Sequence, residues 1–232
     1  MNSASDIEVP SLQLYTYFRS SAAYRVRIAL NLKGLTFESI PVHLVNDGGA
    51  QHSAAFRQIN PNELVPAFID PHQAPGVVLT QSLAILEYLE ETQPTPPLLP
   101  AGATERAWVR SIAQTIACDI HPINNLRVLQ YLTGTLHCDE AQKNQWYRHW
   151  CERGLAALEL MLTRAGRSGQ FCFADTPGLA DCCLVPQVMN AQRFDCDLSA
   201  IPTILRINDA CLALPAFAQA APARQPDAPV AG

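Results

Sequence analysis

The sequence lacks an excess of basic residues, which argues against a polyanion as its main partner. Its 16 Lys and Arg residues are outnumbered by 21 Asp and Glu residues, so the formal net charge is −5. Proteins that bind DNA or RNA usually carry a clustered basic face. We therefore expect no nucleic-acid partner, and any anion-binding site must be local.

Long apolar runs are also missing. No run approaches the roughly 20 residues that a bilayer-spanning helix needs. The opening segment MNSASDIEVPS has neither the basic start nor the apolar stretch of an export signal. The sequence thus predicts a cytoplasmic protein without membrane contact.

Cysteine spacings typical of disulfide frameworks or metal sites are absent, although the chain has eight cysteines. Cys182 and Cys183 are adjacent, and no C-x-x-C pair occurs. The six histidines are scattered and supply no metal-ligand pattern either. We expect reduced, mostly buried thiols and no metal ion.

From residue 11 to residue 92, strand and helix patterns follow in the order βαβ and then αββα. An aromatic-rich strand at 12–18 leads into a helix that begins after two serines and ends before Gly34. Pro66 stands at the start of an apolar strand, a position suited to a tight turn, and we predict a cis peptide bond there. The remaining elements are predicted as strands at 36–44 and 77–80 and helices at 51–58 and 82–91.

Prolines and a glycine crowd residues 93–103, which we interpret as a linker. Beyond it, residues 104–219 are predicted to form an all-helical domain. The segment from Pro215 alternates Ala and Pro and is predicted to be extended, with tails at 1–10 and 220–232. Helices in the second half are expected at 108–118, 124–132, 139–163, 179–191 and 204–212.

The string YFRSSAAYRVRIALNLKG at 17–34 is the first of several ordered motifs along the chain. It resembles the first-helix signature of the zeta class of glutathione transferases, and the similarity to that class runs from Leu12 to about Asp227. The resemblance implies a thioredoxin-like α/β domain, an all-helical domain, a homodimer and glutathione held between the two domains. The further matching strings are NPNELVPAF, QSLAILEYLEE, PTPPLLP, CDIHPINNLRVLQYL, LADCCLVPQVMNAQRF and RQPD.

Two positions depart from the family pattern. Where members with an S-S-C motif have cysteine, this chain has Ala22, so the chemistry cannot depend on a protein thiol there. Where the family usually has Ser or Thr three residues before an aspartate, this chain has Gly178 before Asp181. Glycine at a helix N-cap should cost only a few tenths of a kcal/mol, and Asp181 can still accept backbone N–H groups.

Ser20 and Ser21 are the predicted catalytic serines. They stand where the first strand turns into the first helix, and a helix N-terminus favours an anion. Without the resemblance, ordinary N-capping explains serines at these positions about as well as a catalytic role does. With it, Ser20 is assigned the hydrogen bond to the glutathione thiolate and Ser21 a supporting role, which lowers the thiol pKa toward neutrality.

The resemblance implies further glutathione contacts. Gln81 and Ser82, which begin a predicted helix, would hold the γ-glutamyl group, although a capping Ser after a polar residue is common in any helix. The backbone of Val65, just before Pro66, would pair with the cysteinyl part as an added strand does. Gln51 matches a position that contacts the glycyl end.

Arginines are the expected holders of a dicarboxylate substrate. Arg19 lies beside the proposed sulfur site, and Arg193 matches a family arginine of the substrate pocket. Arg25 and Arg27 are interpreted as helix-surface or domain-interface charges.

Three residues of the second half complete the predicted site. A lone His before a proline is more often structural than a general base, so His121 is interpreted as a binding residue rather than a catalytic one. Asn125 and Arg127 follow it on a helix expected to face the cleft, and they are grouped with the glutathione contacts.

The resemblance implies glutathione-dependent cis–trans isomerisation of maleylacetoacetate to fumarylacetoacetate, with glutathione regenerated as a cofactor. Maleylpyruvate is an alternative substrate, and the sequence distinguishes it poorly from maleylacetoacetate. Leu126 leaves its helix less basic than we would expect in a site that selects a smaller, more charged acid, which favours maleylacetoacetate. A general conjugating transferase would need a more apolar pocket than Arg19 and Arg193 suggest. A binding module without turnover is disfavoured by Ser20, Gln81, Ser82 and Arg193 together.

Overall fold

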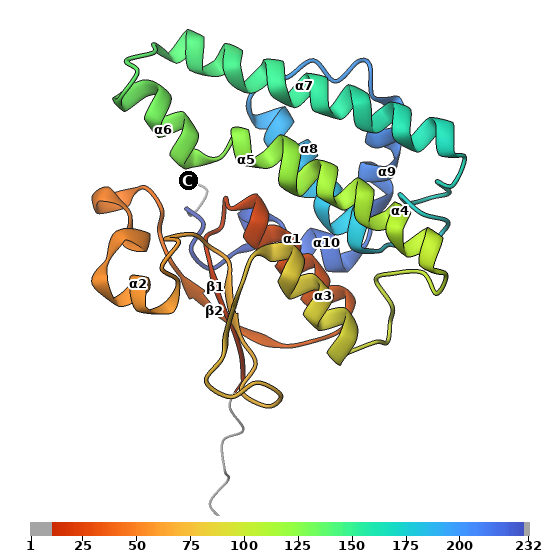
Figure 1. The fold of residues 1–232 in the computed structure, drawn as a ribbon, viewed down its shortest axis with the longest axis horizontal. Coiled ribbons are helices and arrows are strands. Elements are labelled where there is room, and N and C mark those ends of the chain that lie inside the picture. Colours follow the sequence, from red (N-terminus) through yellow and green to blue (C-terminus); the bar gives the residue numbers. More distant parts are fainter. Residues whose placement is uncertain (1–10, 230–232) are drawn as a thin grey trace, which may run out of the picture.

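The computed structural model describes residues 11–229, so the predicted tail at 1–10 and the last three residues of the predicted tail at 220–232 lie outside the described part. Figure 1 shows an α/β half, which holds a small sheet, and a helical half that packs against one side of it. The expected two-part fold is confirmed.

The α/β half is built on a four-stranded mixed sheet of order β2-β1-β3-β4. Strand β1 pairs in parallel with β2 and antiparallel with β3, and β3 pairs antiparallel with β4. This confirms the predicted order of strands and helices. The elements are β1 (Leu12–Thr16), α1 (Ser21–Leu32), β2 (Phe37–Pro41), α2 (Ala54–Ile59), β3 (Ala67–Ile69), β4 (Val78–Thr80) and α3 (Ser82–Thr92), with short 3₁₀ turns at Asn46–Gly48 and Ala50–His52.

The peptide bond between Val65 and Pro66 is cis, as predicted, and it immediately precedes β3. The first two strands are shorter than expected, because β1 ends at Thr16 and β2 at Pro41. The backbone after β1 turns away from the sheet and becomes the loop that leads into α1.

The linker between the halves is anchored by one buried carboxylate. Glu90, on α3, accepts hydrogen bonds from the backbone N–H groups of Leu98 (2.8 Å) and Leu99 (3.1 Å). It also forms an ion pair with the ammonium of Lys33 at 3.0 Å. The proline-rich segment therefore follows one fixed path to the start of the next helix, α4 (Ala103–Gln114).

The helical half follows the predicted pattern, with most helices starting or ending a few residues away from the expected bounds. None of the helices within residues 11–229 is both long and apolar enough to cross a membrane. The elements are α4 (Ala103–Gln114), a π-helical segment (Thr115–Ile120), α5 (His121–Ile123), α6 (Leu126–Gly134), α7 (Glu140–Ala165), α8 (Leu179–Arg193), α9 (Pro202–Leu212), α10 (Pro215–Ala220) and a 3₁₀ turn (Pro222–Arg224).

The prediction of an extended segment from Pro215 was wrong. Residues 215–220 form α10, which packs on α1, and Phe217 is fully buried there (Figure 1). Its carbonyl groups accept hydrogen bonds from side chains of α1, including Tyr24 Oη to Phe217 (3.3 Å) and Asn31 Nδ2 to Ala216 (2.9 Å). These partners lie about 190 residues earlier in the chain, so local composition could not reveal them.

The start of α8 explains the glycine that departs from the family pattern. A Cβ atom on Gly178 would lie 2.6 Å from the carbonyl oxygen of Leu98. That same oxygen accepts the backbone N–H of Leu179 at 2.8 Å. Asp181 accepts the N–H groups of Gly178 (2.8 Å) and Cys172 (2.9 Å), as expected for the helix start. The linker and α8 thus approach too closely for a capping side chain.

Gly178→Ser should therefore destabilise the protein, although capping preferences alone predict a small gain. Crowding a backbone carbonyl should lower the free energy of unfolding by about 1–3 kcal/mol. Denaturant unfolding measures the change. Gly134→Ser is the matched control, since a Cβ there meets nothing within 4 Å; equal effects of the two substitutions would contradict the explanation.

Candidate active site

Ser20 is the N-cap of α1, and its hydroxyl is left with a proton to donate. Its backbone is extended, and its Oγ accepts the N–H of Ala23 at 3.2 Å. A hydroxyl that accepts one hydrogen bond can still donate its own proton to another group. Capping and binding an anion are therefore compatible roles for Ser20. Ser21 follows as the first residue of α1 and is buried.

The loop before Ser20 is fixed from two sides. Arg27, on α1, donates to the carbonyl oxygens of Tyr17 (3.3 Å) and Phe18 (3.1 Å). The carboxylate of Asp227 accepts the N–H of Phe18 at 2.9 Å. Asp227 was missed as a site-positioning residue, although it lies in the RQPD motif of the sequence.

Arg25 and Arg27 were interpreted as helix-surface or domain-interface charges, and the surface position is wrong because both side chains are buried. Only 2% of Arg25 and 1% of Arg27 is exposed. Arg27 lies at the interface with the second half, since its Nε donates to the carbonyl of Ala220 at 3.0 Å. Burial lowers the pKa of Arg27 to about 10, so it stays charged at neutral pH.

Arg19 and Arg193 come from different halves, and the charges of both act on Tyr17. Burial of part of its side chain lowers the pKa of Arg193, and the charge of Arg19 adds to that effect. Both arginines oppose the rise that burial causes in the pKa of Tyr17. Each guanidinium lies over the ring of a neighbouring phenylalanine, at 5.0 Å for Arg19 and 4.9 Å for Arg193. Neither forms an ion pair within residues 11–229. Arg19 directly precedes Ser20, the N-cap of α1, and Arg193 is the last residue of α8 (Leu179–Arg193).

A second group of polar residues surrounds the start of α3. Gln81 is the exposed N-cap, with φ of 69°, and Ser82 follows as a buried first residue of the helix. The Nη1 atom of Arg25 donates to Ser82 Oγ at 3.1 Å. Free backbone N–H groups at this helix start are suited to a carboxylate.

His121 joins this group from the helical half, directly after the π-helical segment. Burial, followed by the charges of Arg25 and Arg127, lowers the pKa of His121 to about 3. It is therefore neutral at physiological pH. Asn125 caps α6 by accepting the N–H of Arg127 at 3.2 Å, and Arg127 itself is exposed.

Val65 and Pro66 are buried beside β3, whereas Gln51 is turned into its own loop. The Nε2 atom of Gln51 donates to the carbonyl of Leu44 at 3.2 Å and contacts the ring of His52 at 3.0 Å. Its Oε1 atom is buried without a partner. No hydrogen bond links Gln51 to the serines of the site.

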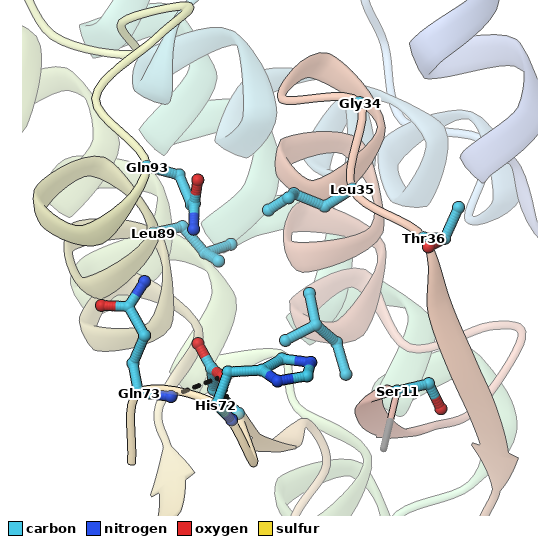
Figure 2. Close-up of a pocket in the computed structure, with 10 residues that line it drawn as sticks. Ser11, Gly34, Leu35, Thr36, His72, Gln73, Leu89 and Gln93 are labelled. Carbon is cyan, nitrogen blue, oxygen red and sulfur yellow. Dashed lines mark hydrogen bonds between the residues drawn. The ribbon is translucent and has the colours of Figure 1, made fainter. Parts of the chain in front are cut away.

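Two hollows lie away from these residues. One is a cavity of about 400 Å³ beside Ser11 and Leu12, where β1 begins, whereas Ser20 follows the other end of that strand. Figure 2 shows the residues that line it. The carboxylate of Asp70 there is already bound to the N–H groups of His72 and Gln73 and to Tyr88 Oη. The other hollow, of about 780 Å³, lies over α7 beside Trp146 and Trp150. Neither contains a predicted site residue.

No group of three or more metal-ligating side chains occurs within the described residues. All eight cysteines are free, and most are buried, as expected. The arrangement thus offers hydroxyl, helix-end and guanidinium donors for anions.

Comparisons with known proteins agree with this geometry. Residues 10–91 match the family model described as the glutathione S-transferase N-terminal domain. A probable maleylacetoacetate isomerase of Vibrio cholerae is 55% identical over 94% of this chain and 99% of that one. The maleylpyruvate isomerase of a Ralstonia species is 49% identical over 93% of this chain and 99% of its own.

Solved structures give the same result. A zeta-class maleylpyruvate isomerase superposes with a TM-score of 0.88 at 48% identity, covering 94% of this chain and all of that chain. A maleylacetoacetate isomerase of Methylobacterium extorquens, solved with malonate and glutathione, has a TM-score of 0.88 at 43% identity with the same coverage. On this identity over nearly its whole length, the chain belongs to the zeta class of the glutathione transferase family.

Proposed function

We propose that this protein is a glutathione-dependent cis–trans isomerase that converts maleylacetoacetate to fumarylacetoacetate. The observation that carries the proposal is that Arg19 directly precedes Ser20, the N-cap of α1, while the charge of Arg19 acts on Arg193, from the other half, and the charges of both act on Tyr17. Relatives named maleylacetoacetate isomerase, such as those of Pseudomonas aeruginosa and rat, are each 48% identical to this chain.

The residues present fit glutathione. Ser20 offers a hydroxyl proton at a helix N-terminus for the sulfur, with Ser21 beside it. Ser82 and the free N–H groups of α3 offer donors for the γ-glutamyl carboxylate. The backbone of Val65 next to Pro66 lies beside the sheet, where an extended peptide can pair. Residues with proposed supporting contacts are Gln51, Gln81, His121, Asn125 and Arg127.

Glutathione, when bound, would supply a sulfur nucleophile for reversible addition to the cis double bond. While the sulfur is attached, that bond is single and can rotate before the sulfur leaves again. Ser20 stabilises the sulfur anion by donating a hydrogen bond, and the end of α1 adds a favourable potential. Ala22 supplies no competing thiol. No protein base is required, and the low pKa of His121 suits a neutral hydrogen-bonding residue.

Arg19 and Arg193 hold the two carboxylates of the substrate and stabilise negative charge that develops on it. A dicarboxylate bound between them offsets the repulsion of the two guanidinium groups. Arg27 and Asp227 keep the loop that carries Arg19 in place. We further propose a homodimer in the cytoplasm, a location in which free thiols are expected to persist.

Maleylpyruvate is the second candidate substrate, because a maleylpyruvate isomerase at 49% identity is about as similar to this chain as the maleylacetoacetate isomerase of Pseudomonas aeruginosa at 48%. Purified protein should be offered each acid, coupled to the matching trans-specific hydrolase, with and without glutathione. We expect glutathione-dependent turnover that is faster with maleylacetoacetate. Faster turnover of maleylpyruvate would reassign the substrate, and turnover of neither acid would refute the isomerase.

Ser20→Ala should raise the pKa of bound glutathione by about one unit, since a lost hydrogen bond to a charged group is worth about 1.5 kcal/mol or more. Thiolate absorbance of the complex, followed against pH, measures this. Ser53→Ala is the matched control, because Ser53 caps α2 through the N–H of Phe56 (3.1 Å). An equal pKa in wild type and Ser20→Ala would remove Ser20 from sulfur activation.

Arg193→Ala should lower kcat/KM for the dicarboxylate by about tenfold to a thousandfold, with little change in glutathione affinity. The loss comes from one missing carboxylate partner. Steady-state kinetics and calorimetric titration with glutathione separate the two effects. Arg153→Ala, at an exposed arginine of α7, is the control. An unchanged kcat/KM in Arg193→Ala would exclude Arg193 from substrate binding.

A further inference from the structure

One buried charge lies directly behind the proposed glutathione site and has few partners of its own. Arg25, on α1, donates from Nη1 to Ser82 Oγ at 3.1 Å. Its Nε and Nη2 atoms are buried without any hydrogen-bond partner. No carboxylate pairs with it among residues 11–229.

Arg27 shows what a fully paired arginine looks like in the same helix. Its Nε donates to Ala220 (3.0 Å), its Nη1 to Thr16 Oγ1 (2.9 Å) and its Nη2 to Phe18 (3.1 Å). A buried charge with unmade hydrogen bonds costs stability, and an apolar side chain of similar size often replaces it without loss. Folding therefore explains Arg27 and leaves Arg25 unexplained.

The hydrogen bond from Arg25 to Ser82 also determines which way the Ser82 hydroxyl can donate its own proton. Because Ser82 Oγ accepts from a guanidinium, its own proton is available for a different acceptor. Ser82 is the first residue of α3, where the backbone N–H groups have no partner within the helix. A carboxylate at this helix end would meet the hydroxyl proton and the N–H groups together.

The groups around Arg25 supply no competing anion. His121 is neutral at physiological pH, as shown above. The thiol of Cys183 feels the positive charge of Arg25, yet burial outweighs it and raises the thiol pKa to about 11. Arg25 is thus a cation without a counter-charge in the chain that surrounds it.

We propose that Arg25 is a positioning residue for the γ-glutamyl carboxylate of glutathione: it orients the Ser82 hydroxyl toward that carboxylate and supplies the buried positive charge that the carboxylate offsets. The inference rests on the proposed function, because it takes glutathione as the ligand. The guanidinium of Arg25 already loses its water when the protein folds. Binding of the γ-glutamyl carboxylate therefore gains the attraction to this charge without a further cost for desolvating the guanidinium.

The test is calorimetric binding of two ligands to wild type, Arg25→Met, Arg25→Lys, Ser82→Ala and the Arg25→Met/Ser82→Ala double variant. The ligands are glutathione and γ-aminobutyryl-cysteinyl-glycine, which lacks only the γ-glutamyl α-carboxylate. Arg25→Met should weaken glutathione binding at least about tenfold, as loss of a charge-assisted contact does. Arg25→Lys should weaken it less.

The analogue and the double variant separate positioning from general damage. The analogue should bind wild type and Arg25→Met equally, because it lacks the α-carboxylate that would lose contacts. In the double variant, the two losses should be less than additive, because Arg25 acts through Ser82. Thermal unfolding without ligand should give Arg25→Met a midpoint equal to or above that of wild type, whereas Arg27→Met should unfold earlier.

Several results would overturn the proposal. Unchanged glutathione affinity in Arg25→Met, or an equal loss for both ligands, would show that the carboxylate does not depend on Arg25. Failure of Arg25→Met to fold would show that the charge is structural. Wild type that binds no glutathione would instead refute the proposed function, so the two failures are distinguishable.

Discussion

The geometry of the site depends on the buried guanidinium of Arg27. It binds the end of β1, the loop before α1 and the carbonyl of Ala220 in the C-terminal part, and so joins three segments that are distant in sequence. A buried arginine is tolerated when carbonyl and hydroxyl oxygens satisfy its donors. Since Arg19 and Ser20 follow the loop directly, their positions are set by this one residue together with Asp227.

The two halves contribute to function in different ways. The α/β half presents two helix N-termini, those of α1 and α3, and each offers free N–H groups next to a serine hydroxyl. The helical half adds Arg193, at the end of α8, and His121, after the π-helical segment. The proposed sulfur site and Arg19 lie in the α/β half, whereas Arg193 lies in the helical half. The proposed isomerisation therefore requires that the halves pack in this orientation.

Much of the fold could be predicted from the sequence, because periodicity and turn residues act locally. The order of strands and helices, the cis bond at Pro66 and the hydrogen bonds of Asp181 at the start of α8 were all confirmed. The errors share one cause. The helix at 215–220 and the burial of Arg25 and Arg27 depend on contacts between distant segments, which local composition does not encode. The effect of the charge of Arg19 on Arg193 likewise depends on how the halves pack. The role of each predicted site residue is still a proposal.

The hydrogen bond from Phe18 to Asp227 spans 209 positions of the chain. On the ribosome, the strand and helix that carry Ser20 emerge long before the residue that holds their connecting loop. Any product of translation that stops short of Asp227 lacks this contact, even if its two domains are otherwise complete. Assembly of the site is in this way linked to completion of synthesis, and prematurely terminated chains should be poor isomerases.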